Sequence, residues 1–278
     1  MIVSSTDGVD VAVHDLAGRG ATGPAVLLSH ATGFHGYCYL PIAEALAPLF
    51  HSIAFDFRGH GDTPQPPHVD IDWNRYADDA EAVALSLTRP LPAFGHSMGG
   101  ACLLMVAHRH PDLFSHLVVF EPIVFPPVVA DDSPPQLAEG ARRRRTTFAS
   151  YDSAIANFAS KQPLGRFTPA ALDAYVRHGF REGDGGQVHI KCLPELEATT
   201  FEMSRNQHTW DLLPEIMVPV LVVCGLPSPD SPAHHSRPVA ERLPNGTYLQ
   251  LDELDHFGPM THPEMIAEMI AELITASI

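Results

Sequence analysis

The sequence lacks long hydrophobic runs and any segment that resembles a targeting signal. No stretch approaches the roughly 18 apolar residues that a membrane-spanning helix needs. The first fifteen residues, MIVSSTDGVDVAVHD, contain neither a basic segment nor an apolar one of the kind found in secretory signals. We therefore expect a cytoplasmic protein that does not enter a membrane.

Basic side chains are also scarce. The 278 residues include 17 Lys and Arg against 33 Asp and Glu, a formal net charge of −16. Nucleic acids and anionic membranes both bind basic surface patches, so we expect neither as a partner. We expect instead a small-molecule ligand, bound by a monomer or a homodimer.

The sequence has no cysteine pairs with metal-binding or redox spacing. Its four cysteines are scattered, which predicts reduced, buried thiols and no disulfide. Histidine is abundant at 17 copies, but pairs such as His108 and His110 have no carboxylates or thiolates at ligand spacing. We expect no metal ion and no other cofactor.

Short apolar runs alternate with helical patterns along most of the chain. This alternation predicts an α/β fold, a mostly parallel twisted sheet with helices on both faces. We expect strands at residues 9–14, 25–29, 51–56, 92–95, 117–120, 220–224 and 247–251. Helical spacing of apolar residues occurs at 39–48, 73–88, 98–110 and 263–275, and Asp72 is expected to cap the second of these helices.

The alternation breaks off in the middle of the chain. Between about 125 and 213 no strand-like run appears, and the composition is typical of short amphipathic helices and loops. We expect an inserted helical cap at 126–213, which divides a core made of residues 1–125 and 214–278. The run RRRR at 142–145 is expected to be a solvated helix face, with an anion site as the alternative.

The segment GHSMG at residues 95–99 matches the pattern G-x-S-x-G, between an expected strand and an expected helix. In that context Ser97 occupies a tight turn with strained backbone angles, so the flanking residues must be small. The turn exposes the hydroxyl group at the amino terminus of the helix. There the backbone N–H of Met98 can face a developing oxyanion.

A serine hydroxyl needs a base to become a nucleophile. His256 follows the last expected strand, so its loop opens at the same sheet edge as Ser97, and we predict that it is the base. The N–H of Thr32, in the loop HATGF, is the candidate second oxyanion donor. The segment DFRGHGD at 56–62 is expected to be structural, its Arg and Asp pinning adjacent loops. Three other histidines are expected to hydrogen-bond loop backbone: His30, His60 and His96.

The motifs HATGF, DFRGHGDT, GHSMGG and DHFGP stand in the order and spacing of the α/β-hydrolase family. The chain resembles a capped, single-domain member of that family over nearly the whole core, and less so over 126–213. Relatives that hydrolyse epoxides or haloalkanes carry an Asp nucleophile at the elbow, so Ser97 implies acyl transfer through a serine ester. The resemblance thus implies a hydrolase of small, largely apolar carboxylic esters or lactones, with a Ser-His-acid triad and an acyl-enzyme.

Other functions are compatible with the same motifs. One is other triad chemistry on this fold, such as that of a C–C bond hydrolase, a thioesterase or a cofactor-free perhydrolase. The other is the function of a catalytically weak small-molecule receptor.

Two residues are candidates for the acid of the triad. The family usually places it three residues past the glycine that ends strand 220–224, where this sequence has Ser228, which cannot ionise. Asp230 lies two residues further. A minority of relatives carry the acid after the strand that follows the nucleophile helix, and here that position is Glu121. We favour Glu121, because a carboxylate is present at 121 while the usual position of the acid, 228, has none. Asp230 is the alternative.

Aromatic side chains near the site and in the expected cap indicate an apolar pocket. Each of them can equally belong to the core of the cap. The candidate pocket residues are Phe34, Phe125, Tyr151, Phe158 and Trp210.

Overall fold

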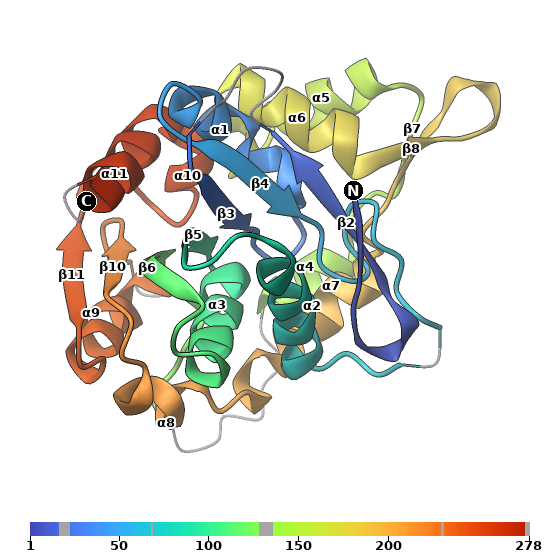
Figure 1. The fold of residues 1–278 in the computed structure, drawn as a ribbon. Helices are drawn as coiled ribbons and strands as arrows, with labels where there is room; N and C mark the ends of the chain where they lie inside the picture. Colours follow the sequence, from blue (N-terminus) through green and yellow to red (C-terminus); the bar gives the residue numbers. More distant parts are fainter. Residues whose placement is uncertain (17–22, 68, 128–135, 229–230, 276–278) are drawn as a thin grey trace.

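A twisted sheet forms the centre of the computed structural model (Figure 1), which describes residues 1–16, 23–67, 69–127, 136–228 and 231–275. Its strands are β1 (Ile2–Ser4), β2 (Asp10–Asp15), β3 (Ala25–Ser29), β4 (His51–Phe55), β5 (Leu91–His96), β6 (Phe114–Phe120), β10 (Val220–Cys224) and β11 (Gly246–Gln250).

The order of this 8-stranded sheet is β1-β2-β4-β3-β5-β6-β10-β11. β2 is antiparallel to β1 and to β4, and all the other neighbours pair in parallel. Parallel strands end at the same edge of a sheet, so the loops that follow β3, β4, β5, β6, β10 and β11 meet there. The predicted fold class is confirmed.

Helices cover both faces of the sheet. In Figure 1, α2, α3 and α9 lie on one side and α1 and α11 on the other. Asp72 caps α2 as predicted, since its Oδ1 accepts the N–H of Asn74 at 2.9 Å. The core helices are α1 (Leu40–Leu46), α2 (Trp73–Ser86), α3 (Met98–Arg109), α9 (Ala233–Arg242), α10 (Gly258–Thr261) and α11 (Pro263–Thr275).

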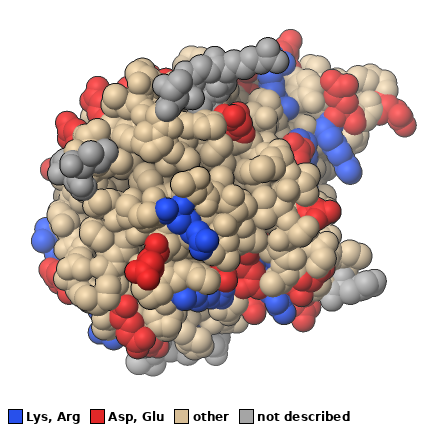
Figure 2. All heavy atoms as spheres, viewed as in Figure 1, with Lys and Arg blue, Asp and Glu red and all other residues tan. Residues whose placement is uncertain are grey.

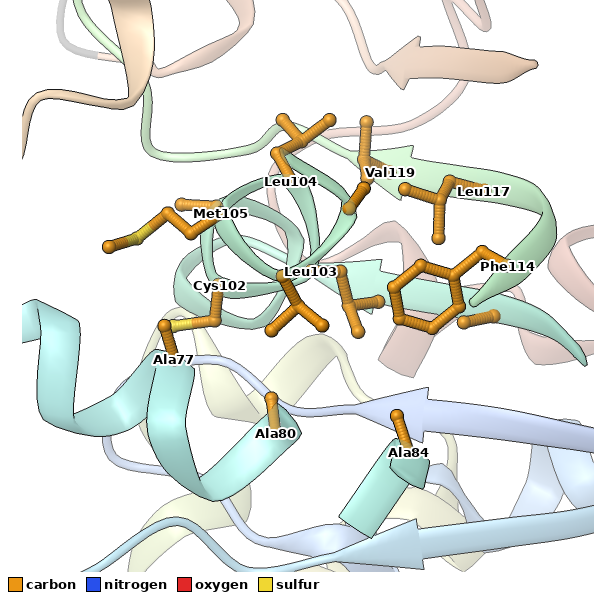
Figure 3. Close-up of a cluster of buried hydrophobic side chains, with 14 of the residues drawn as sticks. Ala77, Ala80, Ala84, Cys102, Leu103, Leu104, Met105, Phe114, Leu117 and Val119 are labelled. Atoms are coloured by element: carbon orange, nitrogen blue, oxygen red, sulfur yellow. The ribbon is translucent and has the colours of Figure 1, made fainter. Parts of the chain in front are cut away.

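Helix α3 is buried along its whole apolar length between the sheet and α2. Small residues on one face of α2 let the two helices approach closely, and Figure 3 shows Cys102 and Leu103 of α3 pointing toward Ala77 and Ala80 of α2. The spacing of three residues places both alanines on one helix face. This packing fixes the amino terminus of α3, which carries Ser97, against the end of β5.

The inserted segment between β6 and β10 contains helices and also a small antiparallel sheet of order β7-β9-β8. The expectation of a segment without strands was therefore wrong, because strands of two or three residues are too short to show a periodicity. Its elements are α4 (Gln136–Arg142), β7 (Thr147–Phe148), α5 (Tyr151–Ala159), α6 (Pro169–Gly179), β8 (Phe180–Glu182), β9 (Val188–Ile190), α7 (Pro194–Glu202) and α8 (Thr209–Leu212). Short 3-10 helices occur in both parts of the chain. Those in the core are η1 (Thr6–Gly8) and η2 (Gly36–Tyr39), and those between β6 and β10 are η3 (Leu164–Arg166), η4 (Asp184–Gly186), η5 (Met203–Asn206) and η6 (Leu213–Glu215).

Three core elements were not predicted, and one of them, α10, is only four residues long. β1 is only three residues long, and α9 has a polar sequence with Pro238 inside it, so neither shows a clear apolar pattern. All four cysteines are buried and free, as expected. None of the described helices is both long and apolar enough to cross a membrane. The face seen in Figure 2 carries acidic and basic side chains intermixed, with no continuous basic area.

Arg58 ties three parts of the core together. Its side chain is 2% exposed and donates to both carboxylate oxygens of Asp79 on α2, at 2.7 and 2.9 Å, and to Asp7 near the amino terminus at 2.8 Å. Burial alone would lower the pKa of Arg58, but the hydrogen bonds from Asp79 and Asp7 hold it above its ordinary value. The structural role expected for the segment 56–62 is confirmed.

This buried ion pair leads to a stability prediction. The substitution Asp79→Asn leaves the Arg58 charge buried without its main partner, so we expect the free energy of unfolding to fall by about 3 kcal/mol or more. Urea denaturation at pH 7 measures the change. Arg75 forms partly exposed pairs with Asp7 and Asp78, and Arg75→Gln is expected to cost less than about 1 kcal/mol. Equal effects of the two variants would contradict the role of the buried pair.

Candidate active site

Ser97 lies at a strained turn between β5 and α3, with φ 57° and ψ −116°. Few residues other than glycine adopt a positive φ. The turn is fixed to the end of β6, since the Ser97 N–H donates to Phe120 at 2.9 Å and the Ile123 N–H donates to Ser97 at 3.2 Å. A Cβ atom on Gly95 would lie 2.7 Å from the Cα of Gly100. The predicted strain and the need for small neighbours are both confirmed.

The two residues that carry the predicted oxyanion donors contact each other through their side chains. Met98 is the first residue of α3, Thr32 lies in the loop after β3, and the Thr32 hydroxyl group donates to the Met98 sulfur at 3.4 Å. Within the described residues, neither backbone N–H donates to another group of the protein. Both are therefore available to a ligand oxygen.

Glu121 and His256 form a hydrogen-bonded pair. Glu121 directly follows β6, is fully buried and has a positive φ of 43°. Its Oε2 lies 2.8 Å from Nδ1 of His256. The same carboxylate accepts the N–H of Gly225 at 3.0 Å and the hydroxyl group of Ser231 at 3.3 Å. The structure thus brings the favoured acid against the predicted base.

The alternative acid, Asp230, lies outside the residues that the structure describes. The loop after β10 nevertheless contributes to the pair through Gly225 and Ser231, which flank the position where the family usually has its acid. No local sequence pattern predicts these two supporting hydrogen bonds.

His96 holds the backbone of the His256 loop beside Ser97. Its Nε2–H donates to the carbonyl oxygen of His256 at 2.8 Å, and its Nδ1 accepts the Tyr39 hydroxyl group at 2.9 Å. The His96 and His256 rings are 4.9 Å apart between centroids. Burial holds the pKa of His96 well below its ordinary value, so the ring is neutral. The expectation that His96 hydrogen-bonds loop backbone is confirmed.

Three further buried histidines are neutral at pH 7. Burial lowers the pKa of His30 to about 3 and the pKa values of His35 and His60 to about 4. His30 Nδ1–H donates to the carbonyl oxygen of Ala31 at 2.8 Å, and its Nε2 accepts the N–H of Phe57 at 2.9 Å. His30 therefore joins the loops after β3 and β4, as expected.

One group of described side chains has a metal-like arrangement. Ligand atoms of His14, Asp56 and Asp62 lie within 4.8 Å of one another. Asp56, however, accepts hydrogen bonds from His14 at 2.8 Å and from the N–H groups of Gly36 and Asp62 at 2.7 Å. Burial alone would raise the pKa of Asp56, but the hydrogen bond from His14 holds it below its ordinary value. These contacts give the carboxylate a structural role between β2 and the loop after β4.

Two of the predicted pocket residues meet through Tyr175 of the inserted segment. The Tyr175 ring lies 5.5 Å from Phe34 and 5.6 Å from Phe158. Phe167 of the inserted segment and Phe257, beside His256, lie 6.1 and 6.4 Å from Phe34. The sequence analysis missed Tyr175, Phe167 and Phe257, since nothing in their local patterns distinguishes them from core aromatics.

The other three predicted pocket residues make different contacts. Trp210 packs against the core cluster on the α3 side of the sheet, whereas Phe34 belongs to the cluster on the other side. The Phe125 ring packs against His235. The guanidinium groups of Arg177 and Arg242 lie over the rings of Tyr151 and Trp210.

The basic run at 142–145 does not form one helix face. Arg142 ends α4 and pairs with Glu195 and Glu202 on the surface, and the Arg143 side chain is 75% exposed. Arg144, in contrast, is only 18% exposed. The expected solvated face was wrong for Arg144, because the chain leaves the helix before this residue and turns it inward.

The chain is similar to known proteins in sequence and in fold. The sequence profile of the alpha/beta hydrolase family matches residues 26–269. The chain is 26% identical over 262 residues to the pimeloyl-(acyl-carrier protein) methyl ester esterase of Chromobacterium violaceum, covering 90% of this chain and 94% of that protein. It is 24% identical over 259 residues to the 2-(acetamidomethylene)succinate hydrolase of Mesorhizobium japonicum, covering 92% of this chain and 89% of that protein. A crystal structure of E-2-(acetamidomethylene)succinate hydrolase superposes with a TM-score of 0.80 at 22% identity and covers 99% of both chains.

The neutral histidines predict sensitivity to acid. The pKa values of His30, His35 and His60 are about 3 to 4 in the folded protein and about 6.5 in an unfolded chain. Between these values the unfolded chain binds more protons, so the free energy of unfolding falls as the pH falls from about 6.5 to 4. Each histidine contributes up to about 1.4 kcal/mol per pH unit.

Urea denaturation at pH 7, 6 and 5 measures this slope. We expect His60→Asn to make it shallower by about 1.4 kcal/mol per pH unit, since one such histidine is removed. The exposed His234 offers the matched control His234→Asn. A slope that His60→Asn leaves unchanged would refute the assignment.

Proposed function

Because the chain belongs to the alpha/beta hydrolase family, we propose that it is a serine hydrolase that cleaves a carboxylic ester or a lactone. The observation that carries the proposal is the hydrogen bond of 2.8 Å between His256 and the buried Glu121, next to the strained turn of Ser97. The curated relatives described above are hydrolases by name, and one of them is a methyl ester esterase.

In the proposed mechanism His256 is the general base. A carboxylate at Nδ1 fixes the proton on that nitrogen and leaves the Nε2 lone pair for the Ser97 hydroxyl group. As Ser97 attacks the carbonyl carbon, its proton passes to Nε2, and Glu121 stabilises the imidazolium that forms. The nucleophile–base hydrogen bond often shortens only when substrate is bound.

The negative charge of the tetrahedral intermediate falls on the former carbonyl oxygen. We assign its stabilisation to the N–H groups of Met98 and Thr32, which have no other acceptor among the described residues. The imidazolium of His256 then gives its proton to the leaving alcohol. In the second half of the cycle, His256 activates a water molecule that hydrolyses the ester of Ser97 and releases the acid.

Glu121 is the proposed acid of the triad. Its carboxylate is fully buried, so it needs hydrogen-bond donors to remain charged, and Gly225 and Ser231 supply two besides His256. These contacts come from the loop after β10. They fix the orientation of the carboxylate and hence of the imidazole ring.

We propose a small acyl pocket bounded by Phe34 and by the inserted segment. The rings of Phe34, Tyr175 and Phe158 form a continuous aromatic contact from the loop after β3 into that segment. Aromatic walls of this kind favour the apolar part of a substrate.

The identity of the acid gives a kinetic prediction. Glu121→Gln removes the charge that orients His256 and stabilises its protonated form, so we expect kcat to fall by about 10⁴. Asp230→Asn and Ser228→Ala are expected to leave kcat within about threefold. Steady-state rates with a p-nitrophenyl ester measure all three variants. Near-normal turnover by Glu121→Gln, or a large loss in Asp230→Asn, would transfer the role to Asp230.

A substrate panel tests the reaction class. We expect hydrolysis of p-nitrophenyl esters of short chain length, of lactones, or of both. Ser97→Ala is expected to abolish this activity, together with covalent labelling by a fluorophosphonate probe. Labelling without hydrolysis of any ester or lactone would favour other triad chemistry. Absence of labelling would favour a receptor with an idle site.

A further inference from the structure

Arg144 is a partly buried cation of the inserted segment, with 18% of its side chain exposed. Its guanidinium group donates to a carboxylate oxygen of Glu197 on α7 and to the hydroxyl group of Tyr175 on α6. Burial alone would lower the pKa of Arg144, but the neighbouring Tyr175 and Glu197 hold it above its ordinary value. The side chain is therefore a fixed positive charge with limited contact to solvent.

This charge lies beside the loop that carries a proposed oxyanion donor. Gly33 follows Thr32 and has a φ of 77°, and a Cβ atom built on it would lie 2.4 Å from Oε1 of Glu197. The positive φ favours glycine at this position, and the short distance shows that the Glu197 carboxylate lies directly against the loop. The Tyr175 ring also lies 5.5 Å from Phe34 in the same loop. The group Arg144, Tyr175 and Glu197 thus covers the loop from the side of the inserted segment.

The hydrogen-bonding capacity of this group is incompletely used. A guanidinium group has five N–H donors, and in the described part of the chain Arg144 uses only the two contacts given above. The loop that carries His60 lies against α7 next to Glu197, since a Cβ atom built on Gly59 would lie 2.1 Å from Cδ1 of Leu196. The Nδ1–H of His60 donates to a backbone oxygen at 3.1 Å, whereas its buried Nε2 has no partner among the described residues. Buried polar atoms without partners are rare in proteins and are consistent with space for a ligand.

A purely structural ion pair accounts poorly for this arrangement. α4 is already joined to α7 by Arg142, which pairs with Glu195 and Glu202 on the surface. Removing a second cation from solvent costs more than an ion pair with one carboxylate usually returns. The planar N–H groups of arginine match the two oxygens of a carboxylate.

We propose that Arg144 binds a carboxylate group of the substrate, with Tyr175 completing the site and Glu197 as the anion that the substrate displaces. The substrate class is then a small ester or lactone that carries a second, ionised carboxyl group. This inference rests on the proposed function and refines the expectation of a largely apolar substrate.

Two p-nitrophenyl esters of similar size test the inference, the hemisuccinate, which carries a carboxylate, and the butyrate, which does not. We expect the wild-type protein to have the higher kcat/KM for the hemisuccinate. Arg144→Gln should lower the hemisuccinate-to-butyrate ratio of kcat/KM by about 10- to 100-fold, the range expected for lost hydrogen bonds to a charged group. Arg142→Gln, which removes the neighbouring surface ion pairs, is the matched control and should leave the ratio unchanged.

Glu197→Gln separates a substrate site from a structural pair. If Glu197 competes with the substrate for Arg144, this variant should raise the ratio for the hemisuccinate, opposite in sign to Arg144→Gln. A structural pair predicts that both variants lose stability and leave the ratio unchanged. That result would overturn the inference, as would a wild-type protein without preference for the hemisuccinate.

A binding measurement distinguishes failure of the inference from failure of the proposed function. Hydrolysis of the butyrate without preference for the hemisuccinate contradicts only the inference. If neither these esters nor any ester or lactone of the panel is cleaved, the proposed function fails, and isothermal titration of Ser97→Ala with succinate still decides the inference. Binding that Arg144→Gln weakens at least tenfold supports it, and no binding refutes it.

Discussion

The buried carboxylate of Glu121 is the constraint around which the carboxyl edge of the sheet is organised. A carboxylate that is fully removed from water stays charged only when donors surround it. Those donors come from two loops, Gly225 and Ser231 after β10 and His256 after β11. Three neighbouring parallel strands must therefore end in register. The positive φ values of Glu121 and Ser97 are local strain that this packing maintains.

Much of this edge could be predicted from the sequence, because local chemistry determines it. The apolar runs give β3 and β10 the predicted bounds, and small residues around Ser97 leave little alternative to the tight turn. Choosing Glu121 rested on the resemblance to the family, which supplied both candidate positions for the acid, and on the presence of a carboxylate at 121 and its absence at 228. Contacts made across the fold have no such local signature, so the hydrogen bonds from Ser231 and the burial of Arg144 were missed.

The inserted segment is docked directly on the loop that carries His256. Arg166 of η3 pairs with Asp255, Phe167 lies 5.7 Å from Phe257, and the N–H of Thr168 donates to Met260 at 3.1 Å. Because these contacts touch the residues on either side of His256, a change in the segment also changes the surroundings of the base. The residues of the segment thus affect both the shape of the proposed pocket and the position of the His256 imidazole ring.

The charged groups at the site come partly from the core and partly from the inserted segment. The charge of Glu121 is shielded behind His256, and burial keeps His30, His60 and His96 neutral. In the proposed mechanism the core side presents N–H dipoles and a proton acceptor to a ligand, and these suit any ester carbonyl group. The guanidinium group of Arg144, in contrast, comes from the inserted segment. On this division, the core determines the reaction, and the proposed choice among substrates depends on whether a ligand offers Arg144 a better partner than Glu197.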